Sequence, residues 1–130
     1  MRASIMAAAV FGISLWSAIG MEEVPFEVLR ERPRRQAAEA QYEAEKRGGA
    51  WIVTIHAGRR PTGGYRVEVR KVEREGARCV VHYRVLEPPP DAMVPQVVTY
   101  PAVMVRFEAA CSEPGVEPPL PGASPDGEER

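Results

Sequence analysis

The side chains in this sequence best suited to covalent chemistry are two cysteines, Cys79 and Cys111. Each has the same parity as the apolar residues of its expected strand, 78–86 or 102–111, so both thiols should point towards the core. If these two strands pair antiparallel in the register that places the cysteines opposite each other, an oxidising compartment would let a disulfide form. Two buried free thiols remain the alternative, because cysteine also packs well as a small hydrophobic residue.

Metal binding and nucleophilic catalysis both lack the residues that they need. Two cysteines and the scattered His56 and His82 match no zinc-site spacing, so we expect neither a metal nor another cofactor. The serines fall before residue 21 or after residue 111, and they are Ser4, Ser14, Ser17, Ser112 and Ser124. A strand histidine is more often packed or solvent-facing than a catalytic base, and a core-facing Cys79 argues against a Cys/His pair. We therefore predict no catalytic residue and a protein that is not an enzyme.

Alternation of apolar and polar residues dominates the chain from residue 50 to residue 111. The stretches "AWIVTIHAG", "YRVEVRKV", "ARCVVHYRVL" and "AVMVRFEAAC" each carry an apolar face with strand periodicity. The first is apolar on both faces near Ile52 and Val53, which is typical of a central strand. Amphipathic strands bury their apolar faces against a second layer, usually another sheet. The predicted fold class is therefore mainly β, a small antiparallel β-sandwich or half-open barrel with one N-terminal surface helix.

The amino terminus has the pattern of a targeting segment. Residues 3–20 carry no charge and follow one basic residue, which predicts a secretory signal peptide over residues 1–20. We accordingly expect a secreted, periplasmic or cell-envelope protein. One alternative is an uncleaved anchor, since eighteen apolar residues are just long enough to cross a bilayer. Another is a cytosolic protein that starts at Met21.

The segment 21–49 is expected to contain little core. Alternating apolar residues within 21–32 suggest an edge strand. Residues 33–49 begin with a proline, consist mostly of good helix formers and end in Gly48-Gly49, so they predict the surface helix.

Two connections and a tail complete the organisation. "GRRPTGGY" at 58–65 joins two expected strands, and "EPPPDAMVPQVVTYP" at 87–101 is long for a loop in a compact domain. Pro61 sets φ at the first corner of the turn, and the two glycines permit positive φ. Prolines stiffen the second loop, which serves either as a binding loop or as a rigid crossover. Residues 112–130, rich in proline, glycine and acids, are expected to be a disordered acidic tail.

The two loop motifs, in this order and spacing, resemble the C-terminal domain of the protease complex subunit PrcB. The resemblance rests on "GRRPTGGY" and on "QVVTYP" at 96–101, and it covers about residues 50–110. It implies a non-catalytic domain that binds a protein partner, possible partners being a secreted protease or another envelope protein. The partner-binding residues implied are Arg59, Arg60, Pro61, Thr62, Gly63, Gly64, Tyr65, Gln96, Thr99, Tyr100 and Pro101.

We expect both loops at one end of the fold, with Tyr65 as the aromatic anchor of a partner surface and Arg59 and Arg60 as its polar rim. Gly63 and Gly64 would let a partner's backbone approach closely. Alternatively, Tyr65 packs inward and the glycines merely make the turn. A net charge of −1 gives no reason to expect nucleic acid, and membrane contact is expected only through an uncleaved signal segment.

A second likeness leads to an alternative function. "RPTGGY" is similar to the "NPTTGY" loop of chagasin-type protease inhibitors, which are immunoglobulin-like sandwiches. That likeness implies a protease inhibitor that uses the loop from Arg60 to Tyr65. A partner that keeps its protease activity distinguishes an assembly subunit from such an inhibitor.

Overall fold

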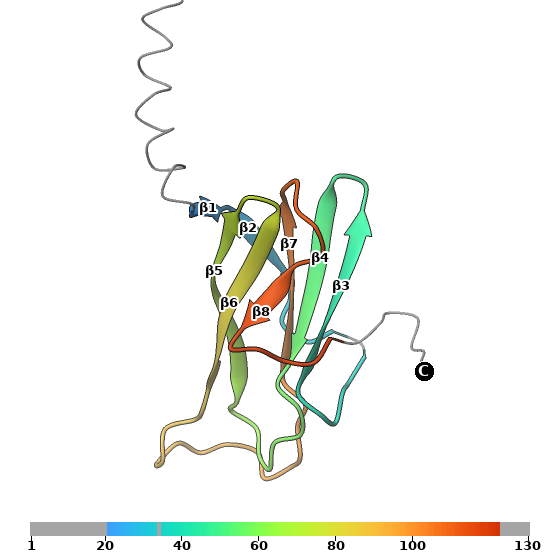
Figure 1. Ribbon diagram of the computed structural model, residues 1–130. Coiled ribbons are helices and arrows are strands. Elements are labelled where there is room, and N and C mark those ends of the chain that lie inside the picture. The colour runs from blue at the N-terminus through green and yellow to red at the C-terminus, as the bar shows by residue number, and fades with distance from the viewer. Residues whose placement is uncertain (1–20, 34, 123–130) are drawn as a thin grey trace, which may run out of the picture.

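The computed structural model describes residues 21–33 and 35–122, which form two packed β-sheets (Figure 1). The predicted signal peptide therefore lies outside the described residues, as does 123–130. The strands are β1 (Glu22–Val24), β2 (Phe26–Arg30), β3 (Gln41–Arg47), β4 (Ala50–His56), β5 (Arg66–Glu75), β6 (Arg78–Leu86), β7 (Ala102–Glu108) and β8 (Gly115–Glu117). Within this part of the chain there is no helix that could span a membrane.

The strand order is β1-β5-β6-β8 in one sheet and β2-β7-β4-β3 in the other. All neighbours are antiparallel except β6 and β8, which are parallel. This arrangement confirms the mainly β fold and the sandwich form of the prediction. The expected edge strand within 21–32 is in fact two strands, because the chain passes from one sheet to the other at Pro25.

The core lies between the sheets and is built from the alternating residues identified in the sequence. Val53, Ile55 and Val105 of one sheet face Val72 and Val81 of the other, and all five are fully buried. Each such side chain contributes about 1.5–3 kcal/mol through its removal from water. The central strand β4 is buried on both faces over most of its length, as its sequence predicted.

The predicted helix over 33–49 is wrong for the described residues. Residues 41–47 instead form β3, which pairs with β4 along its whole length. Because β2 and β3 lie at opposite edges of one sheet, the segment 31–40 crosses that sheet, with Pro33 and Arg35 near Thr54 and Met104. Ala37, within this crossing segment, is buried. The helix propensity of this segment is outweighed by the free edge of β4, against which Tyr42 and Ala44 pack towards the core.

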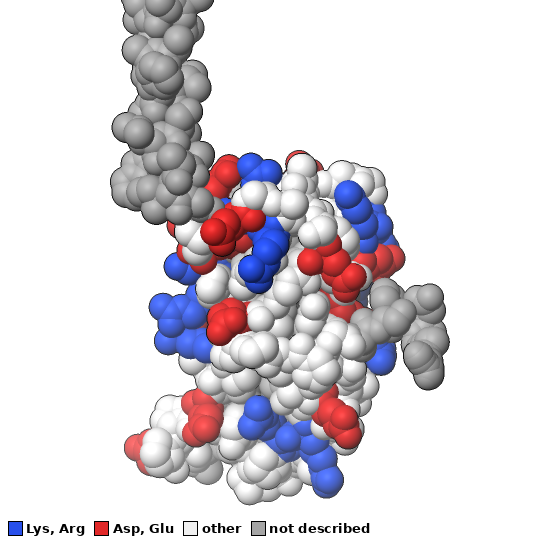
Figure 2. Space-filling view, in the orientation of Figure 1, with Lys and Arg blue, Asp and Glu red and all other residues white. Residues whose placement is uncertain are grey.

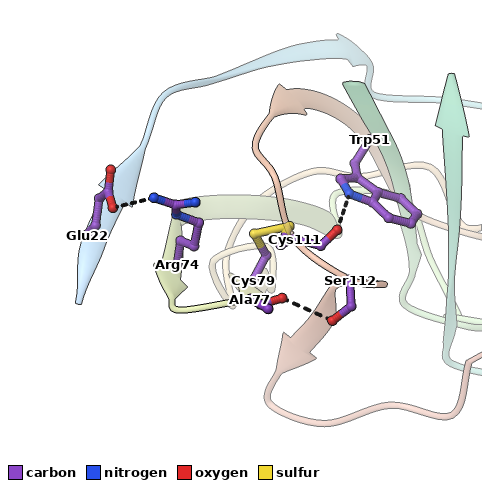
Figure 3. The surroundings of a disulfide bond; sticks show 7 residues. All are labelled: Glu22, Trp51, Arg74, Ala77, Cys79, Cys111 and Ser112. Carbon is purple, nitrogen blue, oxygen red and sulfur yellow. Dashed lines mark hydrogen bonds and ion pairs between the residues drawn. A yellow bond between two sulfur atoms is a disulfide. The ribbon is translucent and has the colours of Figure 1, made fainter. Parts of the chain in front are cut away.

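The disulfide between Cys79 and Cys111 is present, with 5.9 Å between the two Cα atoms. The strand pairing from which it was predicted is wrong, because β6 and β7 belong to different sheets. Cys111 follows the end of β7, in the segment that leads to β8, and β8 pairs with β6. The Trp51 indole N–H donates to the backbone oxygen of Cys111 at 3.3 Å (Figure 3). This hydrogen bond connects β4 to a residue of the disulfide. Both cysteines are buried, as predicted, but the bridge joins β6 to the connection between β7 and β8.

The expected disordered tail does not begin at residue 112. Residues 115–117 form β8 beside β6, and Pro114 and Val116 are buried. The chain then crosses to the other sheet, where Pro121 accepts a hydrogen bond from the backbone N–H of Tyr42 at 3.2 Å. This segment is ordered despite its few apolar residues, because each of its ends pairs with an existing strand.

Candidate protein-binding end of the sandwich

The two motif loops lie together at one end of the sandwich, at the bottom of Figure 1, as predicted. The backbones of Arg60 and Thr99 exchange two hydrogen bonds, of 2.8 and 2.9 Å. The Thr99 hydroxyl donates to the Thr62 carbonyl at 2.7 Å, and the Gly63 N–H donates to the Pro95 carbonyl at 2.9 Å. One isolated antiparallel bridge, between Arg60 and Thr99, thus joins the two loops. Neither loop is an independent turn.

Gly63 and Gly64 give room to the second loop of the same chain. A Cβ on Gly63 would lie 2.9 Å from the Pro95 ring, and one on Gly64 would lie 2.8 Å from both Pro88 and Val94. Gly64 also has a φ of +90°, which side chains rarely adopt. The described contacts therefore use these glycines for packing between the loops, and their role towards a partner stays a prediction.

The first motif combines an exposed Arg59 with a half-buried arginine and a half-buried Tyr65. Arg59 is exposed, whereas Arg60 is half-buried and donates from Nη2 to the Ala57 carbonyl at 3.2 Å. The Arg60 guanidinium also lies over the Tyr65 ring, 5.6 Å from its centre. Thr62 is half-buried as well, and its hydroxyl donates to the Gly63 carbonyl at 2.9 Å. Arg60 and Thr62 thus stabilise the loop and offer only part of their surface.

The base of the first loop is held by segments that are distant in the sequence. The Ala57 N–H donates to the Pro101 carbonyl at 2.9 Å, and the Arg59 N–H donates to the Ala38 carbonyl at 3.0 Å. Of the predicted residues in the second loop, Gln96 is exposed while Tyr100 is half-buried. The structure therefore brings all the predicted partner-binding residues to one end, with several of them engaged in holding it together.

The most exposed apolar residues of this end were missed from the sequence. Met93 is 98% exposed, Val97 58% and Val98 42%, and all three lie in the proline-rich loop. Figure 2 shows uncharged surface at this end of the molecule, with basic and acidic side chains beside it. Hydrophobic residues in a proline-stiffened loop, outside any alternating strand, were the signal that could have identified them.

The profile of the PrcB C-terminal family matches residues 51–108 of this chain. This segment, 51–108, is therefore similar to the PrcB C-terminal family. No curated protein and no solved structure matches the chain. The matched segment contains β4 to β7 and both motif loops, so it contains the whole candidate site except for the contact from Ala38.

The PrcB C-terminal segment also supplies the two central strands of each sheet. Strands β5 and β6 are central in one sheet and β7 and β4 in the other, while β1, β8, β2 and β3 form the edges. All four edge strands, and Cys111, lie outside 51–108. The flanking segments of this chain thus cover the sheet edges, which would otherwise expose unpaired backbone groups.

Several charged residues of the matched segment form ion pairs on strands β5 and β6. Glu73 is 3.1 Å from the Lys71 ammonium and 2.8 Å from the His82 ring, and the hydrogen bond from Lys71 is the main cause of a lowered pKa of Glu73. Arg84 pairs with Glu68 at 2.6 Å. No group of side chains in the described residues could hold a metal ion. Strands β5 and β6 thus carry ordinary surface ion pairs.

Proposed function

We propose that this chain is an exported, non-catalytic protein-binding domain that assembles with or stabilises a secreted protease or another envelope protein. The family supports the general class, because PrcB C-terminal domains are associated with protease complexes and are of a non-catalytic type. Export is supported by the uncharged run at 3–20 and by a disulfide that suits an oxidising compartment.

The observation that carries the proposal is the joined pair of loops. Proline-rich sequence and backbone hydrogen bonds hold the loops in one shape, so little conformational entropy is lost when a partner binds. Met93, Val97 and Val98 supply the apolar centre of the surface, and Arg59 supplies part of its rim. Tyr65, Gln96, Thr99, Tyr100 and Pro101 support this surface, and Pro61, Thr62 and Arg60 hold its first loop.

The experiment is capture of partners from the native envelope fraction with the exported protein. The double variant Met93→Ser/Val97→Ser should lose the partner, because interface centres typically contribute 2 kcal/mol or more, or about thirtyfold in affinity. The control is Met21→Ser/Val28→Ser, which removes two apolar residues that are 46% and 47% exposed and lie outside both motif loops. If both double variants hold the same partner as the wild type, the loop surface is not the binding site.

Two further measurements separate the alternatives. Sequencing of the mature protein from its host should find an amino terminus at or near Met21, outside the cytoplasm. A protease that is captured with the domain should keep its activity. If its activity instead falls on titration with the domain, the inhibitor alternative, which uses the Arg60–Tyr65 loop, is favoured.

A further inference from the structure

A second, unrelated site lies on the outer face of the sheet that contains β2, β7, β4 and β3. A cleft of about 580 Å³ opens there between the sheet and the crossing segment 31–40. It lies within the size range of small-molecule sites. Arginines from β2, the crossing segment and β3 line it, together with Glu43, Thr54 and His56. This cleft lies mainly outside the surface proposed above for a protein partner. Binding of a ligand there would be a function additional to partner binding.

The floor of the cleft contains a buried histidine that lacks hydrogen bonds. His56 is 1% exposed, and neither of its ring nitrogens has a hydrogen-bond partner among the described residues. Its Nε2 lies 3.5 Å from Oε2 of Glu43, and Glu43 is ion-paired with Arg35. Buried polar groups in proteins are almost always satisfied, so this imidazole needs a partner, which a water or a ligand in the cleft can provide.

The charges around His56 favour an anion. Burial, followed by the Arg35 guanidinium, lowers the pKa of His56 below its ordinary value of 6.5, so the ring is neutral at pH 7. The charged groups that line the cleft are Arg30 from β2, Arg35 from the crossing segment, and Glu43 and Arg47 from β3. Arg47 pairs with Glu45, but Arg30 makes no ion pair with any residue that the structure describes. One guanidinium is therefore available to a ligand.

The remaining walls of the cleft are apolar. Leu29 and Met104 line it on the side of Arg30, and Leu29 is 40% exposed. A ligand that fits these walls combines one negative group with a short hydrocarbon part. A carboxylate suits the guanidinium geometrically, since its two oxygens match the paired N–H groups of arginine.

We propose that this cleft binds an organic carboxylate, held by Arg30 and the His56 ring, with its hydrocarbon part against Leu29 and Met104. Glu43 lies next to Nε2, so the other ring nitrogen must become a donor to bind a carboxylate. His56 therefore takes up a proton when the ligand binds, and becomes a doubly donating imidazolium between Glu43 and the ligand. The proton comes from solvent, and no covalent bond to the ligand forms.

The test uses the full chain, with the ring nitrogens of His56 observed by NMR. The probes are acetate, butyrate and hexanoate, their methyl esters, and a short peptide with a free or an amidated carboxyl terminus. We expect the acids to shift the His56 nitrogens to imidazolium values in a saturable way and the esters to have no effect. Affinity should rise by up to about tenfold per pH unit as the pH falls from 8 to 6, because binding takes up a proton. Binding of the peptide acid alone assigns the site to a peptide terminus, and binding of the simple acids assigns it to small acids.

Arg30→Gln provides a second test that does not disturb the buried histidine, because Arg30 is exposed. We expect this variant to bind the acid at least tenfold more weakly. The control Arg78→Gln removes an exposed arginine from the other sheet and should bind like the wild type. The proposal is overturned if no acid shifts His56, if the esters bind equally well, or if Arg30→Gln leaves the affinity unchanged.

Discussion

The contact between the two motif loops predicts a graded effect for alanine at four glycines. Gly64 combines a φ of +90° with a close approach to Pro88 and Val94, whereas Gly63 has the close approach to Pro95 without a positive φ. Gly76 has a φ of +61° with nothing within 4 Å of the position of its Cβ. Gly49 has neither feature. The four Gly→Ala variants thus separate backbone strain from loss of the loop contact.

The magnitudes follow from these two features. A left-handed φ costs a non-glycine residue about 1–2 kcal/mol. Forcing a methyl group into a packed site costs about 1–3 kcal/mol. Relative to Gly49→Ala, we expect a loss of unfolding free energy of about 1–2 kcal/mol for Gly76→Ala and about 1–3 kcal/mol for Gly63→Ala, and about 2–5 kcal/mol for Gly64→Ala. Using Gly49→Ala as the reference cancels the entropy that alanine removes from the unfolded chain.

Urea denaturation without reductant measures these differences, because the disulfide then remains intact in both states. Domains of this kind have about 5–15 kcal/mol of stability, so the largest effect should be easily resolved. If Gly64→Ala is no more destabilising than Gly76→Ala, and Gly63→Ala no more than Gly49→Ala, the loops do not pack on each other. The reasoning about a single joined surface would then be refuted.

Three further predictions concern the core and its charges. Replacing Cys79 and Cys111 together by alanine should cost about 3.5 kcal/mol, because their bridge spans a sequence separation of 32; a change below about 1 kcal/mol in the urea midpoint analysis would contradict this. The lowered pKa of His56 means that the unfolded chain binds a proton more readily than the folded chain. Stability should therefore be fully present above pH 6.5 and fall as the pH drops below it, by at most about 1.4 kcal/mol per pH unit, and His56→Gln should remove this dependence in pH-dependent unfolding. Trp51→Phe should cost about 1–3 kcal/mol, because the Cys111 carbonyl loses its indole donor and the ring becomes smaller; thermal unfolding of the two proteins checks this.

The alternating residues allowed much of the sandwich to be predicted. Val67, Val81 and Val105 lie on the buried faces of their strands, as their parity required, because successive side chains of a strand point to opposite faces. The same rule placed both cysteines inward. The loop motifs were recognised as well, since proline and glycine specify turn geometry locally, and their position at one end follows from the order of the strands.

The partners of each strand were decided only by the tertiary structure. Residues 41–47 have the composition of a helix, but the open edge of β4 makes them a strand. Residues 115–117 have too little apolar surface to order alone, but β6 provides the hydrogen bonds and the second layer covers Val116. Likewise, the sequence does not distinguish Met93 from other loop residues, and only the structure shows that the joined loops leave its side chain exposed.

The amino-acid sequence by itself therefore determined which faces are apolar, where the chain turns and which thiols point inward. These are properties of single residues and their near neighbours. The tertiary structure decided that the disulfide joins β6 to the connection between β7 and β8, that the flanking segments supply the edge strands of both sheets, and that His56 is buried beside Glu43. Such features depend on residues far apart in the chain, and the burial that determines their energies exists only once both sheets are in place.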